Sequence, residues 1–157
     1  MKEAIINNEI RLYYPENYVI LNEEELRELY KNDDPNRWVV RNKDEHIAIA
    51  VLWQGYNRAL TALADLKATA KRNEQLMKNG LHSYSYKCNG FISEEVCNQT
   101  AQGYCYEYEV EGISQHARTL LFKVGRNIYG ITCYTRGPMS EYAADLFNQI
   151  LASVEKA

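Results

Sequence analysis

The last third of the chain contains three stretches with the period-two alternation of β-strands, and they run directly into one amphipathic helix. The strands are predicted within QGYCYEYEVEG, SQHARTLLFKVG and RNIYGITCYTRG, and the helix within MSEYAADLFNQILASV. Consecutive strands joined by short glycine-containing turns pair in antiparallel fashion. A following helix covers one face of such a sheet, because each element has an apolar side to bury. Residues Tyr104 to Val154 therefore predict an α+β fold with a central antiparallel sheet.

Size and composition limit the possible classes of protein. The 157 residues are expected to form one domain, residues 1–157, and the 46% of hydrophobic residues is typical of globular proteins. A net charge of −3 gives no reason to expect nucleic acid as a partner. No segment approaches the roughly 20 apolar residues of a membrane span. The opening MKEAIINNEI lacks a signal-peptide core, so a cytoplasmic location is expected, with export after loss of a leader as the alternative.

The first half of the chain is predicted to contain short strands and two helices. Asn22 and Glu25 form a capping-box pattern for the first helix, and Gly80 is expected to end the second helix in the left-handed conformation. The strand that begins at His46 has apolar residues on both faces, which predicts a central position in the sheet. Asn89 and Gly90 indicate either a tight turn or a bulge. The expected elements are strands at Glu9–Tyr14, Tyr18–Leu21, Arg37–Asn42, His46–Gln54 and Leu81–Cys88, and helices at Glu23–Tyr30 and Asn57–Asn79.

The turns of the closing strands predict their register. A two-residue turn at Gly125 and Arg126 pairs Phe122 with Tyr129, and a three-residue turn at 112–114 pairs Tyr104 with Phe122. These registers predict one continuous buried face, and they place Cys105 and Cys133 on opposite faces. The terminal helix is expected to pack on the sheet through Leu146 and Ile150. The predicted buried face consists of Tyr104, Tyr106, Leu120, Phe122, Tyr129 and Ile131.

Two segments resemble the PsbP-like family, which is named for an extrinsic subunit of the photosynthetic oxygen-evolving complex. They are the hairpin FKVGRNIYGITCYTR and the helical FNQILASV, and Tyr14, Pro15 and Tyr18 are similar to the family's opening aromatic and proline segment. The resemblance implies a three-layer α/β/α sandwich, with a central antiparallel sheet flanked by helices. It also implies a binding protein, because the fold includes photosystem subunits, a nuclear import factor that binds the GTPase Ran, and bacterial proteins of unknown role.

The candidate site residues form two groups, each with a simpler structural explanation. Tyr104, Tyr106 and Tyr108 alternate along one strand and could line a ligand pocket or fill the core. Lys67, Lys71 and Lys78 could form a docking patch, or a solvated helix face with a Glu74 to Lys78 pair. These six residues are the tentative ligand or partner surface.

Other polar residues predict neither a metal site nor a catalytic site. The three histidines and four cysteines have no zinc spacing, and all four thiols are expected to be reduced. The alternating Glu107, Glu109 and Glu111 indicate a solvated or cross-strand-paired face more than a calcium site.

The sequence therefore predicts a protein without catalytic residues, metal or cofactor. It favours a binding or accessory domain that presents a surface to a protein partner of unknown identity, in an oligomeric state that the sequence does not indicate. The alternative is a small-ligand carrier with a tyrosine-lined pocket between sheet and helix. An enzyme with an unrecognised hydrolase or transferase site is a third hypothesis.

Overall fold

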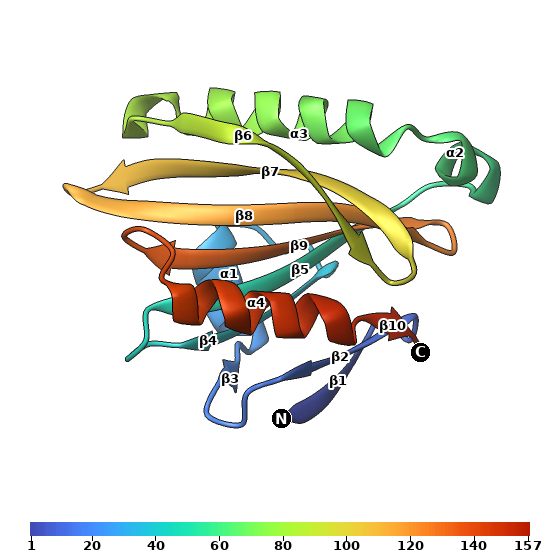
Figure 1. The fold of residues 1–157 in the computed structure, drawn as a ribbon, viewed down its shortest axis with the longest axis horizontal. Coiled ribbons are helices and arrows are strands. Elements are labelled where there is room, and N and C mark those ends of the chain that lie inside the picture. The colour runs from blue at the N-terminus through green and yellow to red at the C-terminus, as the bar shows by residue number, and fades with distance from the viewer.

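A computed structural model describes residues 1–157 and shows three layers (Figure 1). The middle layer is a seven-stranded antiparallel sheet with the order β3-β4-β5-β9-β8-β7-β6. This central sheet between outer layers confirms the predicted α+β sandwich. Its strands are β3 (Val19–Ile20), β4 (Arg37–Asn42), β5 (Ile47–Gly55), β6 (Lys87–Val96), β7 (Gln99–Val110), β8 (Ile113–Val124) and β9 (Asn127–Arg136).

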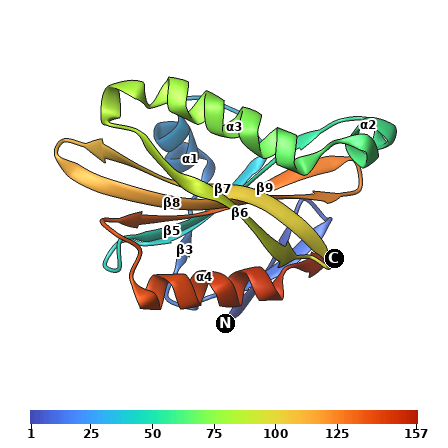
Figure 2. The same ribbon diagram turned by 45° about the horizontal axis from the view of Figure 1, so that its top comes forward.

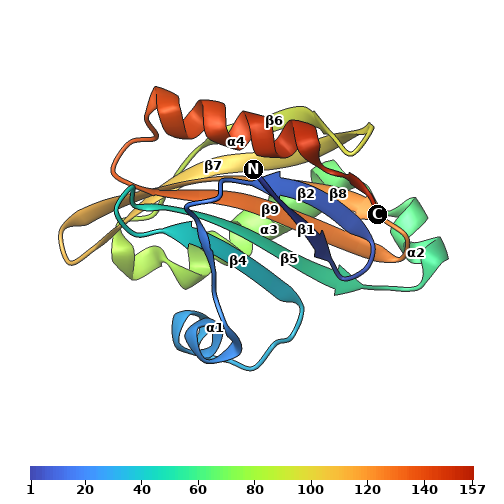
Figure 3. The same cartoon turned by 90° about the horizontal axis from the view of Figure 1, so that it is seen from below.

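Helices α3 and α4 lie on opposite faces of the sheet (Figure 2). The face under α3 is also covered by α1 and α2, whereas the face under α4 carries a small sheet of order β1-β2-β10 (Figure 3). The strands β1 and β10 were not expected from the sequence, so this outer layer is part helix and part sheet. The helices are α1 (Glu23–Tyr30), α2 (Arg58–Leu63), α3 (Leu66–Gly80) and α4 (Glu141–Ser153), and the small strands are β1 (Lys2–Ile6), β2 (Ile10–Tyr14) and β10 (Glu155–Lys156).

Local capping determines where α1 and α4 begin. The Asn22 side chain accepts a hydrogen bond from the Glu25 amide, and the Glu25 carboxylate returns one to the Asn22 amide, which confirms the predicted capping box. At α4 the Ser140 hydroxyl oxygen accepts a hydrogen bond from the Ala143 amide, and no side chain returns one. The spacing of Tyr142 with Leu146 and Ile150 predicts that it shares their buried side, but Tyr142 is 55% exposed and the buried side of α4 begins at Ala143. The predicted packing of α4 through Leu146 and Ile150 is confirmed, since both belong to the main core.

The register of β8 with β9 is as predicted, but that of β7 with β8 is not. Phe122 pairs with Tyr129, whereas Tyr104 pairs with Thr119. The β7–β8 turn has two residues, Glu111 and Gly112, with φ of 52° and 77°, as a tight hairpin turn requires. The partner of Tyr104 is Thr119 rather than Phe122, which is a shift by an odd number of residues. The tyrosines therefore lie on the face of the sheet opposite Phe122.

This register divides the core between the two faces of the sheet. Leu120, Phe122, Tyr129 and Ile131 pack under α4 and the small sheet, whereas Tyr104, Tyr106 and Ala117 form a separate cluster under α3. The prediction for the thiols changes with the register. Cys105 and Cys133 both pair with Arg118 from opposite sides and therefore share a face, contrary to expectation. All four cysteines are free.

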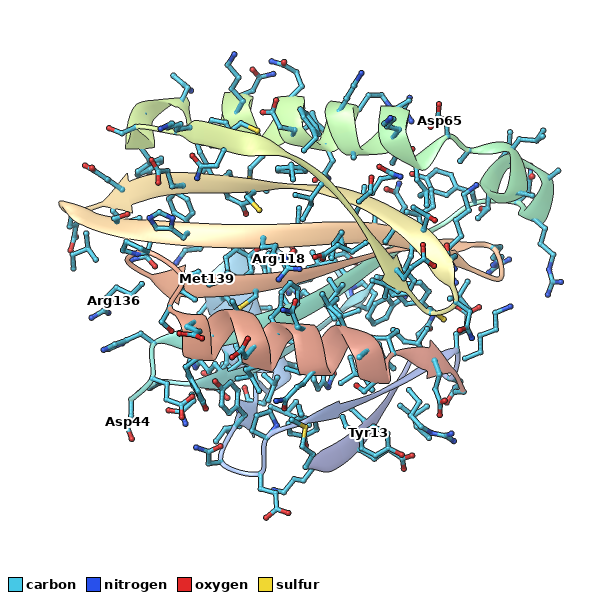
Figure 4. All side chains as sticks on the ribbon, in the orientation of Figure 1. Tyr13, Asp44, Asp65, Arg118, Arg136 and Met139 are labelled. Carbon is cyan, nitrogen blue, oxygen red and sulfur yellow. The ribbon has the colours of Figure 1, made fainter.

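The predicted long helix is two helices. Ala64 is extended, with φ −63° and ψ 130°, and the Asp65 carboxylate caps α3 by accepting hydrogen bonds from the Lys67 and Ala68 amides (Figure 4). Gly80 is the last helical residue and does not adopt the expected left-handed conformation. Leu81 is the C-cap residue of α3.

The segment after α3 also differs from the expected strand at Leu81–Cys88. A 3₁₀ turn, η1 (His82–Tyr84), follows α3, and β6 begins only at Lys87. Of the two alternatives for Asn89 and Gly90 the structure has the bulge, since β6 continues past it with a shift of register.

Candidate binding surface

The tyrosine ladder of β7 lies beneath the inner side of α3. Tyr104 and Tyr106 are 0% and 2% exposed, and Tyr108 is half-buried. Their rings follow one another at centroid distances of 5.6 and 6.1 Å. The Tyr104 hydroxyl donates a hydrogen bond to Asn73 of α3, and the Tyr86 hydroxyl donates one of 2.9 Å to Glu74. The ladder and the neighbouring Tyr86 therefore hold α3 on the sheet, through ring packing and through hydroxyl hydrogen bonds.

Alkaline pH is expected to destabilise the protein through these tyrosines. Burial raises the pKa of Tyr104 and Tyr106 far above the ordinary tyrosine value. In the unfolded chain they ionise near pH 10. Their contribution to stability is therefore complete below about pH 10 and is lost above it, by up to about 1.4 kcal/mol per pH unit for each tyrosine. Urea midpoints measured across this range should fall above pH 10, and a flat profile would contradict the burial.

The lysines of α3 lie together on the side of the helix that borders β6. Lys67, Lys71 and Lys78 are exposed, and helical spacing places them on one side. None has a carboxylate within 4.0 Å. The expected Glu74 to Lys78 pair is absent, because Glu74 accepts the hydrogen bond from Tyr86. The lysine side of α3, defined by these three residues, also carries Glu74, but the three lysines themselves have no carboxylate partner.

Helix α2 buries a polar residue and exposes its leucines. Thr61 is 1% exposed and its hydroxyl donates a hydrogen bond of 2.8 Å to the carbonyl oxygen of Arg126. Leu60 and Leu63 are 59% and 83% exposed. The helical spacing of Leu60 and Leu63 with Leu66 and Ala70 predicts one buried side for a continuous helix, but the break before Asp65 turns Leu60 and Leu63 outward. An N-cap aspartate within LADLKAT was the sequence signal for this break.

A recess of about 430 Å³ lies along the other side of α3. Thr69 and Asn73 of α3 form one wall, and Gly130 of β9 is on the floor. Sequence reasoning did not find this recess, because its walls come from segments far apart in the chain. Its full lining is Asp34, Asn36, Leu52, Trp53, Gln54, Tyr56, Thr69, Asn73, Leu121, Ile128 and Gly130.

A second recess, of about 330 Å³, is basic. Arg41, Lys43, His46 and Arg136 contribute to its lining, which contains no carboxylate. Arg41 also forms an ion pair of 3.3 Å with Glu25 of α1. Arg136 lies at the end of β9 and projects from the surface (Figure 4).

Histidines, cysteines and carboxylates do not gather into a metal site anywhere in the structure. Glu107 forms a pair of 3.3 Å with His116 across the β7–β8 ladder, so this carboxylate has a cross-strand partner as expected. The other basic residues of β8, Arg118 and Lys123, have different partners. Arg118 is engaged by Glu94 instead, and Lys123 donates to the carbonyl oxygens of Ala62 and Ala64.

Comparison with solved structures assigns the fold. The cyanobacterial PsbP, CyanoP, from Synechocystis sp. PCC 6803 matches with a TM-score of 0.69 and 12% identity over 99% of this chain and 92% of that one. A mutant of the protein Mog1 matches with a TM-score of 0.60 and 10% identity over 98% and 94%. A protein from Bacteroides thetaiotaomicron VPI-5482 matches with a TM-score of 0.63 and 13% identity over 99% of this chain. This chain spans only 48% of that protein's length.

No family model and no curated protein matches the sequence. The structural matches nevertheless show that the chain has the α+β sandwich fold of PsbP and Mog1, as its resemblance to the PsbP-like family implied. None of the four helices combines the length and the apolar character that spanning a bilayer requires.

Proposed function

We propose that this chain is a non-catalytic, PsbP-like binding or accessory domain, residues 1–157, which presents a surface to another protein. One observation carries the proposal, namely the inverted polarity of α2. Two leucines that face water on one short helix contribute favourable free energy to binding when a partner covers them. Thr61 and Lys123 hold α2 in this orientation through hydrogen bonds to backbone carbonyl oxygens. The leucines are therefore presented by a helix that is fixed in place.

The test is a variant in which Leu60 and Leu63 are both replaced with Ser. We expect the stability of the domain to change little, because both side chains are exposed. Binding to a partner recovered with the wild-type chain from its native cells should weaken at least about tenfold, as for central interface residues. Leu29→Ser is the matched control, since Leu29 is 52% exposed on α1. Equal binding by the double variant would contradict the role of α2.

A second candidate function is that of a small-ligand carrier. The recess beside α3 favours it, because about 430 Å³ falls in the size range of ligand pockets. The ligand would lie against Thr69 and Asn73, and the tyrosine of this recess is Tyr56 rather than a member of the buried ladder. Thermal-shift screening against metabolites and lipids tests this function, because a ligand that binds only the folded state raises Tm. A shift that is lost in Asn73→Ala, with Arg72→Ala as control, would support the carrier.

The proposal includes a cytoplasmic location. The four free thiols support it, because disulfides are rare in reducing compartments. Fractionation of the native cells tests this part, and recovery of the protein only outside the cytoplasm would contradict it.

A further inference from the structure

The strand β6 forms an open edge of the seven-stranded sheet. It has ten residues and pairs only with β7, whereas β3 at the other edge has two residues. An edge strand presents unpaired N–H and C=O groups, and another extended chain can add to it as a new strand. The bulge between Cys88 and Gly90 interrupts the ladder near its start. The regular part of the open edge is therefore Gly90–Val96.

One side chain at this edge is aromatic and exposed. Phe91 is 51% exposed and its ring centroid lies 6.1 Å from that of Tyr104, so it projects on the α3 face of the sheet. A recess of about 300 Å³ adjoins it, with Lys67 and Lys71 of α3 on one side and Ser93 of β6 on the other. A chain added to β6 would pass directly beside this recess.

The charge beside this edge is strongly positive. Helix α3 carries Lys67, Lys71, Arg72 and Lys78 against Glu74 alone, four positive charges less one negative, which leaves +3 in a chain whose net charge is −3. The lysine side faces β6 and has no carboxylate partner, as described above. An added strand with carboxylates on the α3 face would provide these partners.

We propose that the edge of β6 binds an extended acidic segment of a partner protein, whose carboxylates contact the lysine side of α3 and whose apolar side chains contact Phe91. The inference rests on the proposed function and gives the chemistry of the partner. Glu95 lies on the same face of β6 as Phe91, and it places the acidic residues of the segment near Gly90, because it would repel carboxylates near Val96.

A second copy of this chain fits the edge less well. Antiparallel pairing of two β6 strands is symmetric about an axis perpendicular to the sheet, so both α3 helices would lie on the same face. Their lysine sides would then face each other, and like charges at close range oppose pairing. The charge distribution therefore favours an acidic partner over a homodimer.

The experiment uses a fluorescently labelled peptide in which threonine occupies alternate positions and the positions between are glutamate or valine, so that glutamate and valine share one face. It is titrated with the full chain and followed by anisotropy. The double variant Lys67→Gln/Lys71→Gln should bind about tenfold more weakly than the wild type, as two lost exposed ion pairs imply. Arg58→Gln/Arg72→Gln removes the same charge from α2 and α3 but not from the lysine side, and it should retain wild-type binding. Binding should also weaken as salt increases.

A peptide of the same sequence with alternate amides methylated tests the backbone pairing. It keeps its charges but cannot complete a strand ladder, so we expect it to lose binding. Equal binding of both peptides, no binding of either, or a preference for anionic lipid vesicles would overturn the proposal. So would dimerisation through β6 in sedimentation experiments.

A further comparison separates this proposal from the proposed function. If the lysine variant retains the native partner while the Leu60 and Leu63 variant loses it, the proposed function stands and the acidic segment is excluded.

Discussion

Replacing Gly103 with Ala is expected to destabilise the protein by about 3 kcal/mol or more, because the added methyl group meets backbone that cannot move aside. A Cβ at this position would lie 1.7 Å from the carbonyl oxygen of Thr119 and 2.9 Å from the Cα of Leu120. Both atoms belong to β8, which pairs with β7 at this point. Accommodation requires the two strands to separate in the middle of the sheet.

The urea midpoint measures this effect, and Gly80→Ala is its matched control. A Cβ at Gly80 has no atom within 4 Å, and alanine is the better helix former by up to about 1 kcal/mol. We therefore expect opposite signs for the same chemical change. A Gly103→Ala midpoint equal to that of the wild type would show that β7 and β8 are less closely packed than described.

Replacing Phe147 with Ala is expected to cost about 3 to 5 kcal/mol, as for other large buried aromatic residues. Phe147 is 0% exposed and belongs to the main core between α4 and the sheet. Its ring also lies 5.2 Å from the guanidinium carbon of Arg118, so the variant loses a cation–π contact.

Exposed Gln149 on the same helix provides the control, because Gln149→Ala removes no buried contact. Denaturation followed by circular dichroism should give a much lower midpoint for Phe147→Ala and a midpoint near wild type for Gln149→Ala. Similar midpoints for the two variants would contradict the packing of α4 on the sheet.

Local interactions explain why parts of this fold could be predicted. The capping box of Asn22 and Glu25 lies within four residues, and the turn at Gly125 and Arg126 determines the register of β8 and β9. The apolar pattern on both faces of β5 likewise indicated its central place in the sheet. In the first two cases the interacting groups are close in sequence, and in the third the apolar pattern lies within one strand. Each of these patterns can therefore be recognised in the sequence.

The candidate surface was only partly predictable. The spacing of Lys67, Lys71 and Lys78 places them on one side of a helix, whatever that helix packs on. Their position beside an open edge strand depends on β6, which follows a 3₁₀ turn where a strand was expected and contains a bulge that the sequence left open. The recess beside α3 likewise combines segments that are distant in the chain.

The sequence alone determined the α+β class, the capping box of α1 and the hairpin of β8 with β9, because these depend on periodicity and on contacts between near neighbours. Only the tertiary structure decided which face the tyrosine ladder occupies and which way α2 turns. The first depends on a turn of two residues rather than three, and one such change moves every side chain of a strand to the other face. The second depends on Thr61, whose hydrogen-bond partner Arg126 lies 65 residues away. Long-range contacts of this kind leave no periodic pattern in the sequence.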